Sequence, residues 1–251
     1  MVRILLSGAC GRMGRQVAAL AEEGAIIAGV DVNPRSDCVA FPVYPSFSLV
    51  RETADVLMDF SRPEGLGALL TYALAHKTPV VLAATGYNQQ DLAAISEAAK
   101  EIPIFRSANM SMGIFVLRTL ARQAAKLLPD FDIEIVEKHH NQKIDAPSGT
   151  ALMLYEAVSN EASRPVYGRS GRTQKREKAE IGIHAVRGGT VAGEHEVGFY
   201  GPGETVLLSH SAQDRSIFAR GALRAAAFIL SRQPGAYDMA DLAAALTQTR
   251  K

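Results

Sequence analysis

The residues best suited to chemistry in this sequence lie together just past its midpoint. His139 and His140 leave an apolar–polar run, Lys143 follows them, and a Pro-Ser-Gly-Thr turn opens a helical pattern at Gly149 and Thr150. A helix N-terminus binds anions through its free N–H groups, and a lysine adds a positive charge. Histidine exchanges protons near neutral pH. The segment therefore predicts a site that binds a carboxylate-bearing substrate and supplies protons to it.

Each of these residues also has a plain structural interpretation. Asp145 and Ser148 are suited to cap the helix that follows, and Lys143 alone is an ordinary solvated lysine. Adjacent histidines on a strand point to opposite faces, so we expect no shared metal ion and a structural role for one of His139 and His140. The sequence does not decide which of the two faces the substrate. Their combination in one short segment favours the functional interpretation.

A second candidate site is the glycine-rich turn at residues 8–14, Gly-Ala-Cys-Gly-Arg-Met-Gly, which follows an apolar run and opens a helical pattern. Glycines let the backbone approach a pyrophosphate, whose charge then rests on the N–H groups of the helix. Asp31 ends the next apolar run, where an acid binds the adenosine ribose. The pattern predicts a bound dinucleotide. Asp31 favours NAD, whereas Arg35 would offset its charge and admit NADP. The alternative is a tight turn without a ligand.

Composition excludes several other classes of protein. The chain has 251 residues, 47% of them hydrophobic, and a net charge of +1. This balance predicts a globular protein with no general attraction to nucleic acid or to a membrane surface. No apolar run reaches the length of about 18–20 residues that a membrane span needs, and the N-terminus lacks the features of a signal peptide. We therefore expect a cytoplasmic protein.

The pattern of elements changes along the chain. The first part alternates short apolar strands at 2–7, 25–30, 55–60, 80–84 and 102–105 with helices at 11–23, 63–76 and 91–100. The second part has helices at 114–128, 148–159, 216–230 and 238–247, and strands at 131–137, 181–187, 196–200 and 205–210. Apolar strands that alternate with helices indicate a parallel sheet covered on both faces. We expect an α/β protein: a parallel-sheet unit followed by a smaller α+β unit.

Three further segments receive structural interpretations. Cys10 and Cys38 have neither zinc-site nor CxxC spacing, so both are expected to be reduced, with Cys10 a small filler in its turn. The basic segment 163–178 is expected to be a solvated, mobile loop, with a lid over an acidic substrate as the alternative. The glycine-containing segments 187–189 and 193–195 are expected to be turns. The basic residues of the loop are Arg164, Arg169, Arg172, Lys175, Arg176 and Lys178.

Taken together, these motifs resemble the 4-hydroxy-tetrahydrodipicolinate reductase (dihydrodipicolinate reductase) family nearly end to end. The block from His139 to Ala151 is the most specific part of the resemblance. The other matching motifs are Gly-Arg-Met-Gly at 11–14, Asp-Phe-Ser at 59–61, Thr-Gly at 85–86, Ala-Asn at 108–109, Arg-Gly-Gly at 187–189, Gly-Glu-His at 193–195 and Phe-Ala-Arg-Gly-Ala at 218–222.

The resemblance implies a fold, a reaction and a set of site residues. It implies a Rossmann-like dinucleotide-binding domain at 1–110 and 217–251, a substrate-binding and oligomerisation domain at 111–216, and a homotetramer. The reaction is the reduction of 4-hydroxy-tetrahydrodipicolinate to tetrahydrodipicolinate by NADH or NADPH in lysine and diaminopimelate biosynthesis. Proton transfer falls to His139 and Lys143, and substrate binding to His140, Gly149 and Thr150. Cofactor contacts fall to Gly8, Ala9, Cys10, Gly11, Arg12, Met13, Asp31, Ala83, Ala84, Thr85, Ser107, Ala108, Asn109 and Met110.

The chain departs from the family pattern at three places. Ala83-Ala84 replaces a common Gly-Thr, Met110 stands where an aromatic residue is common, and Val32 follows Asp31 where Arg or Lys is common. The last departure weakens the case for strong use of NADP. Two rival functions remain: another amino-acid-type dehydrogenase, such as an aspartate or homoserine dehydrogenase, and a non-catalytic dinucleotide sensor.

Overall fold

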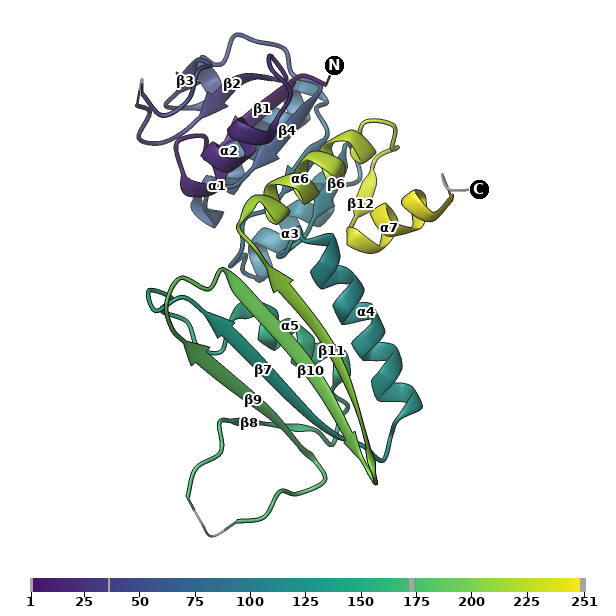
Figure 1. Cartoon of the computed structure of the whole chain (residues 1–251). Helices are drawn as coiled ribbons and strands as arrows, with labels where there is room; N and C mark the ends of the chain where they lie inside the picture. The colour runs from purple at the N-terminus through teal and green to yellow at the C-terminus, as the bar shows by residue number, and fades with distance from the viewer. Residues whose placement is uncertain (1, 36, 172–173, 249–251) are drawn as a thin grey trace. The chain divides into compact units, whose positions relative to one another are not determined.

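The computed structural model describes residues 2–35, 37–171 and 174–248, and its chain divides into two units. Unit 1 consists of Met1–Met112 and Arg215–Lys251, and unit 2 of Gly113–Asp214. In Figure 1, unit 1 carries the purple, blue and yellow elements, and unit 2 the teal and green ones. Both ends of the chain therefore build unit 1, and unit 2 is inserted between them.

Unit 1 is built on a seven-stranded parallel sheet in the order β12-β6-β5-β4-β1-β2-β3. Its strands are β1 (Ile4–Ser7), β2 (Ile26–Val30), β3 (Val43–Tyr44), β4 (Val56–Asp59), β5 (Val80–Leu82), β6 (Pro103–Arg106) and β12 (Gly235–Tyr237). The central strands are apolar and buried because helices cover both faces of a parallel sheet.

The helices of unit 1 form two layers. They are α1 (Arg12–Leu20), α2 (Leu66–His76), α3 (Gln89–Ala98), α6 (Ser216–Ile229) and α7 (Met239–Gln248), with short 3-10 turns η1 (Phe47–Leu49) and η2 (Pro63–Gly65). Helices α2 and α3 contribute Leu69 and Ile95 to one apolar core with β1, β4 and β5. Helix α6 packs on α1, β4, β5 and β6, and apart from Ile229 its buried residues are alanines and a glycine, which permit a close approach.

The sequence did not predict two strands of this sheet. β3 and β12 have only two and three residues, too few to show a strand period, and each pairs with a single neighbour at an edge. The segment before α7 therefore completes the sheet on its β6 side. None of the helices in the described residues is long and apolar enough to cross a membrane.

Unit 2 is a five-stranded mixed sheet in the order β11-β10-β7-β9-β8. Its strands are β7 (Asp132–His139), β8 (Arg164–Tyr167), β9 (Glu180–Arg187), β10 (Gly193–Gly201) and β11 (Glu204–Ala212). Helices α4 (Met112–Leu127) and α5 (Gly149–Val158) cover one face, where Leu117 and Leu154 pack against Ile135 and Val197. On the other face Leu207 and Tyr200 are exposed. The alternation of burial along β11 follows from this one-sided cover.

Two expectations for unit 2 were wrong. The segment at 193–195 is not a turn but the start of β10, which pairs with β11 from Gly193 to Gly201 and with β7 from Glu194 to Tyr200. The basic segment is not a free loop, because it contains β8 and the arginines that the structure describes in it are ion-paired. Arg169 bonds Glu134 and Glu180, and Arg176 bonds Glu134 and Asp132.

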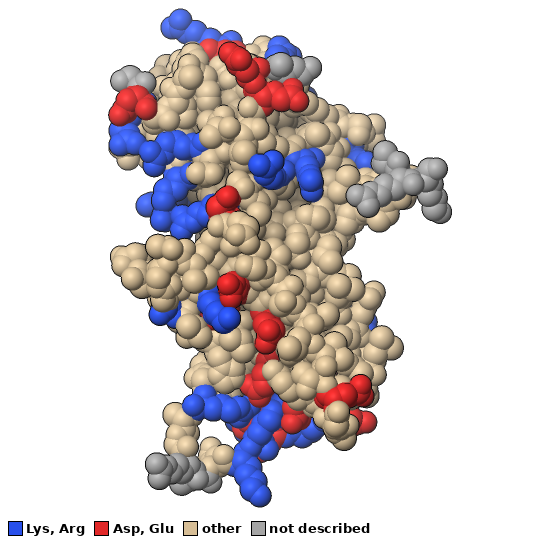
Figure 2. Space-filling view, in the orientation of Figure 1, with Lys and Arg blue, Asp and Glu red and all other residues tan. Residues whose placement is uncertain are grey.

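Figure 2 shows these basic and acidic side chains lying against one another around β8 and the loop that follows it. The segment contains six basic residues and one acid, so its partners Asp132, Glu134 and Glu180 come from β7 and β9 and no local pattern showed the network. Arg172 lies outside the described residues.

Candidate functional site

The predicted cofactor residues of unit 1 lie at one edge of its sheet. The turns after β1, β2, β5 and β6 carry them, and the carboxyl ends of parallel strands all meet at this edge. The order of the strands reverses between β1 and β4, where Ser7 lies opposite Asp59. Ligands of open α/β sheets bind in the crevice outside such a reversal point.

The glycine turn has the backbone that a dinucleotide requires. Gly8 has a φ of 74°, which favours glycine, and a Cβ on Gly14 would come within 2.2 Å of the Gly8 carbonyl oxygen. Helix α1 can therefore begin directly against the end of β1. Within the described residues, Gly11 caps α1 without a side-chain hydrogen bond and no acid stands in the first turn. The N–H groups of that turn fit a pyrophosphate.

Asp31 holds the glycine turn from the end of β2. Its Oδ2 accepts a hydrogen bond from the Cys10 N–H at 2.9 Å, and its Oδ1 accepts one from the Asn33 N–H at 3.0 Å. The carboxylate therefore stands beside the glycine turn. Three of the predicted cofactor residues have buried side chains: Ala9, Ala84 and Met110. A ligand at this edge would therefore contact neighbouring residues rather than these side chains.

The expectation of two reduced cysteines was wrong, because Cys10 and Cys38 form a disulfide with a Cα–Cα distance of 5.4 Å. The bond joins the glycine turn to the segment that follows Asp31. Cys10 is thus a covalent anchor rather than a filler of its turn. The sequence could not show the pairing, because the two residues are 28 positions apart and only the parallel pairing of β1 with β2 brings their loops together.

Asp59 is a buried acid at the same edge that the spacing of the sequence did not single out. It ends β4, its Oδ1 accepts from the Ser61 N–H at 3.1 Å, and the Tyr87 hydroxyl donates to its Oδ2 at 3.4 Å. Burial raises the pKa of Asp59 and outweighs these hydrogen bonds. An acid at the end of an otherwise apolar strand was the available signal.

In unit 2, β7 ends on His139, whose ring lies against a fully buried carboxylate. His139 Nδ1 donates to Glu137 Oε2 at 2.6 Å. The two side chains share a face because residues two apart on a strand point the same way. On its far side the ring borders Gly193, where a Cβ would come within 3.1 Å of His139 Nε2. Any other residue at position 193 would therefore crowd that nitrogen.

Glu137 has two further partners. The Arg187 guanidinium donates to both of its oxygens, at 2.8 and 2.7 Å, and the Ser148 N–H donates to Oε1 at 2.9 Å. Burial alone would raise the pKa of Glu137, but Arg187, His139 and the Ser148 N–H outweigh it and hold the pKa below its usual value. Glu137 and Arg187 were not predicted as site residues.

The turn between β7 and α5 carries the remaining predicted residues. Lys143 Nζ lies 2.8 Å from Asp145 Oδ1, so Lys143 is ion-paired and mostly buried rather than a free surface lysine. Ser148 caps α5, because its Oγ accepts from the Ala151 N–H at 3.2 Å. Gly149 and Thr150 form the first turn of α5. The N–H groups of a first helical turn have no partner within the helix itself. The structure therefore brings the proton-transfer and anion-binding candidates onto one connection.

His195 is a further residue of this cluster. Its Nε2 lies 3.1 Å from Ser148 Oγ, and its ring meets that of His139 edge to face at 5.1 Å between centroids. Burial, followed by the charge of His139, lowers the pKa of His195 to about 4. His195 is therefore neutral at physiological pH. The sequence predicted a turn here, so it gave no reason to place this ring beside His139.

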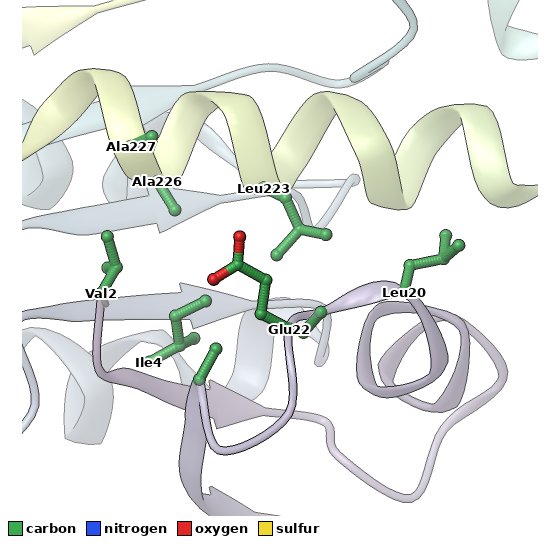
Figure 3. Close-up of a pocket in the computed structure, with 9 residues that line it drawn as sticks. Val2, Ile4, Leu20, Glu22, Leu223, Ala226 and Ala227 are labelled. Atoms are coloured by element: carbon green, nitrogen blue, oxygen red, sulfur yellow. The ribbon is translucent and has the colours of Figure 1, made fainter.

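A separate cavity of about 260 Å³ lies in unit 1 between β1, the end of α1 and α6. Its walls are aliphatic, and the carboxylate of Glu22 points toward the α6 side of the space (Figure 3). None of the predicted site residues lines it. In the described part of the chain, no group of three or more His, Cys, Asp or Glu side chains is placed to hold a metal ion.

The chain matches one family along nearly its whole length. Residues 2–110 match the model described as dihydrodipicolinate reductase, N-terminus, and residues 113–243 match dihydrodipicolinate reductase, C-terminus. A 4-hydroxy-tetrahydrodipicolinate reductase from Caldanaerobacter subterraneus subsp. tengcongensis is 52% identical over 96% of this chain and 98% of that protein. Another from Clostridium tetani is 47% identical over 95% of this chain and 96% of that protein.

The solved structures show the same fold. A dipicolinate-bound dihydrodipicolinate reductase from Paenisporosarcina sp. TG-14 has a TM-score of 0.77 and 23% identity, over 95% of this chain and 97% of that one. The predicted fold class, a Rossmann-like parallel sheet with a second α+β unit, is confirmed. The chain belongs to the dihydrodipicolinate reductase family and is an NAD(P)H-dependent oxidoreductase of lysine and diaminopimelate biosynthesis, as its motifs predicted.

Proposed function

We propose that this chain acts in the cytoplasm and reduces 4-hydroxy-tetrahydrodipicolinate to tetrahydrodipicolinate through the site on unit 2. The connection between β7 and α5 carries the proposal, because His139, Lys143 and the first turn of α5 lie within one short segment. Dipicolinate, which is bound in the Paenisporosarcina relative, is itself a small dicarboxylate. A substrate of that class needs N–H donors and a cation for its carboxylates, and a proton donor for its ring.

The residues of the chain have distinct tasks in this reaction. The 4-hydroxyl group of the substrate leaves as water, and NADH or NADPH, when bound, would supply a hydride from carbon 4 of its nicotinamide to carbon 4 of the substrate. His140, Gly149 and Thr150 bind the substrate carboxylates at the start of α5. His139 and Lys143 deliver the proton that the reduced ring takes up.

In unit 1, the glycine turn holds the pyrophosphate and Asp31 the adenosine ribose. The turns at Ala83–Thr85 and Ser107–Met110 line the nicotinamide end. Asp31 followed by Val32 favours NADH, because the carboxylate repels a 2′-phosphate and the exposed valine offers it no charge.

A steady-state assay tests the reaction. Pyruvate and aspartate semialdehyde are converted to the substrate in situ by a coupling synthase, and the oxidation of NADH and of NADPH is followed separately. We expect oxidation that depends on the synthase and is faster with NADH. Binding of the cofactor without any oxidation would refute the proposal and support a dinucleotide sensor. Oxidation with other amino-acid precursors only would identify another dehydrogenase.

The role of Lys143 is tested by Lys143→Ala. We expect kcat to fall about 100-fold or more, the range of a lost general acid, while the dissociation constant for NADH stays unchanged. Fluorescence titration and the coupled assay measure the two quantities. Lys100→Ala is the matched control, because Lys100 is also ion-paired to a carboxylate but lies exposed on unit 1. A Lys143→Ala enzyme with a normal kcat would remove Lys143 from the mechanism.

We also propose that the chain forms a homotetramer through the uncovered face of the unit 2 sheet. The described helices pack on the other face only, and Val186, Tyr200 and Leu207 remain exposed on this one. Exposed apolar side chains on a flat sheet are typical of an interface between subunits.

A further inference from the structure

The carboxylate of Glu137 sits at the centre of the unit 2 site without reaching a substrate position itself. It is fully buried, and four hydrogen bonds converge on its two oxygens. Oε1 accepts from the Ser148 N–H and from Arg187, and Oε2 accepts from Arg187 and from His139 Nδ1. Each oxygen of an ionised carboxylate has two lone-pair sites, so this set of donors uses all of them.

This arrangement fixes where His139 carries its proton. Because Oε2 can only accept, Nδ1 of His139 has to donate, and the neutral ring is held as its Nδ1–H tautomer. Its Nε2 is then the nitrogen that takes up and releases a proton. That nitrogen lies next to Gly193, where the Cβ of any other residue would crowd it.

We propose that Glu137, fixed by Arg187, is the positioning residue that sets the tautomer of His139 and ties it to the substrate-binding turn at Ser148. This inference rests on the proposed role of His139. In the reaction the proton leaves Nε2 of the charged ring for the substrate carbon, the ring stays neutral with its Nδ1–H on Glu137, and solvent returns the proton. The one carboxylate thus positions the proton donor and the first residue of the anion-binding turn together.

The other groups around the ring do not compete for Nδ1. His195, from β10, meets the His139 ring edge to face, and its Nε2 is occupied by Ser148 Oγ. Arg187, from β9, donates hydrogen bonds from its two terminal nitrogens to Glu137 and to backbone carbonyls. Lys143, from the following turn, is paired with Asp145. Among the described residues, Glu137 is therefore the carboxylate that acts on His139.

The substitution Glu137→Gln tests whether Glu137 sets the tautomer of His139. An amide nitrogen in place of Oε1 would face two donors, Ser148 N–H and Arg187. An amide nitrogen in place of Oε2 would face Arg187 and His139 Nδ1. His139 Nδ1 becomes an acceptor when the ring carries its proton on Nε2 instead. The variant should therefore adopt the second arrangement and flip His139 to the Nε2–H tautomer.

The tautomer is measured by 15N NMR of histidine-labelled, ligand-free protein, with the His139 signals assigned by their loss in His139→Gln. We expect a protonated Nδ1 in the neutral wild-type ring and a protonated Nε2 in Glu137→Gln. The wild-type measurement stays informative even if the Glu137→Gln variant does not fold. A wild-type ring protonated at Nε2 would overturn the proposal, as would a Glu137→Gln spectrum identical to that of the wild type.

Kinetics supply the second measurement. A histidine held in the wrong tautomer is a poor proton donor, so kcat of Glu137→Gln should fall about 10- to 100-fold while NADH binding is unchanged. Glu101→Gln is the matched control, because it breaks an exposed ion pair with Lys77 on unit 1. An unchanged kcat in Glu137→Gln would refute the positioning role. An unchanged kcat in His139→Gln would instead refute the proposed role of His139 in proton transfer. The NMR measurement of the tautomer does not depend on that role.

Discussion

His195 shows how a single buried group ties stability to pH. Its ring is desolvated beside His139, which lowers its pKa from 6.5 in the unfolded chain to about 4 in the folded protein. Between these values the unfolded state binds more protons than the folded state, so the free energy of unfolding falls as the pH falls through this window. The difference of roughly 2–3 pKa units corresponds to about 3 kcal/mol.

We predict that His195→Gln removes this part of the pH dependence. In the wild type, the free energy of unfolding should drop by about 3 kcal/mol more between pH 7 and pH 4 than in the variant. Urea unfolding at several pH values measures the difference. Parallel curves for the two proteins would show that His195 does not titrate below its ordinary pKa in the fold.

The sequence revealed some site residues and concealed others for a physical reason. His139, Lys143 and Gly149 share one short segment, so their types and spacing could be recognised directly. Glu137 and Arg187 are 50 positions apart and meet only because β7 and β9 pair in parallel. Which strands become neighbours is decided by the tertiary fold, so the sequence around either residue does not show this contact.

At the scale of elements, the disulfide between Cys10 and Cys38 closes a loop that contains β2 and the segment after Asp31. A cross-link stabilises a fold mainly by reducing the entropy of the unfolded chain, and a separation of 28 residues corresponds to about 3–4 kcal/mol in that model. Unit 1 should therefore lose stability when the bond is reduced.

We predict that dithiothreitol lowers the free energy of unfolding of unit 1 by about 3 kcal/mol in the wild type. The same reagent should leave Cys38→Ser unchanged, since that variant has no bond to reduce. Denaturant unfolding with and without the reductant measures the effect. Equal midpoints for the wild type under both conditions would contradict the prediction.

The elements themselves were predictable where they were long and periodic. The helices α1, α4 and α6 were expected near their observed positions, because each presents an apolar stripe to a core. The edge strands β3, β8 and β12 were missed. Each has two to four residues, and its extended form depends on a neighbouring strand rather than on its own pattern.

At the scale of the whole molecule, the uncovered face of the unit 2 sheet should decide the assembly state. We predict that Leu207→Glu lowers the mass in solution from a tetramer to a smaller species, because a charge would be buried in the interface. Analytical ultracentrifugation measures the mass. Leu127→Glu is the control, since Leu127 is an exposed leucine of α4. A Leu207→Glu protein that remains tetrameric would place the interface elsewhere.

The insertion of unit 2 into the sequence of unit 1 also fixes the order in which the parts of unit 1 are synthesised. A ribosome adds about 5–20 residues per second and releases the N-terminus first. The strands from β1 to β6 emerge early, but α6, which covers β4, β5 and β6, is translated only after all of unit 2. The apolar surface under α6 thus stays bare for on the order of ten seconds in every nascent chain. Transiently exposed apolar surface of this kind is prone to aggregation, which is why chaperones exist. A message truncated before Ser216 would leave the surface bare permanently.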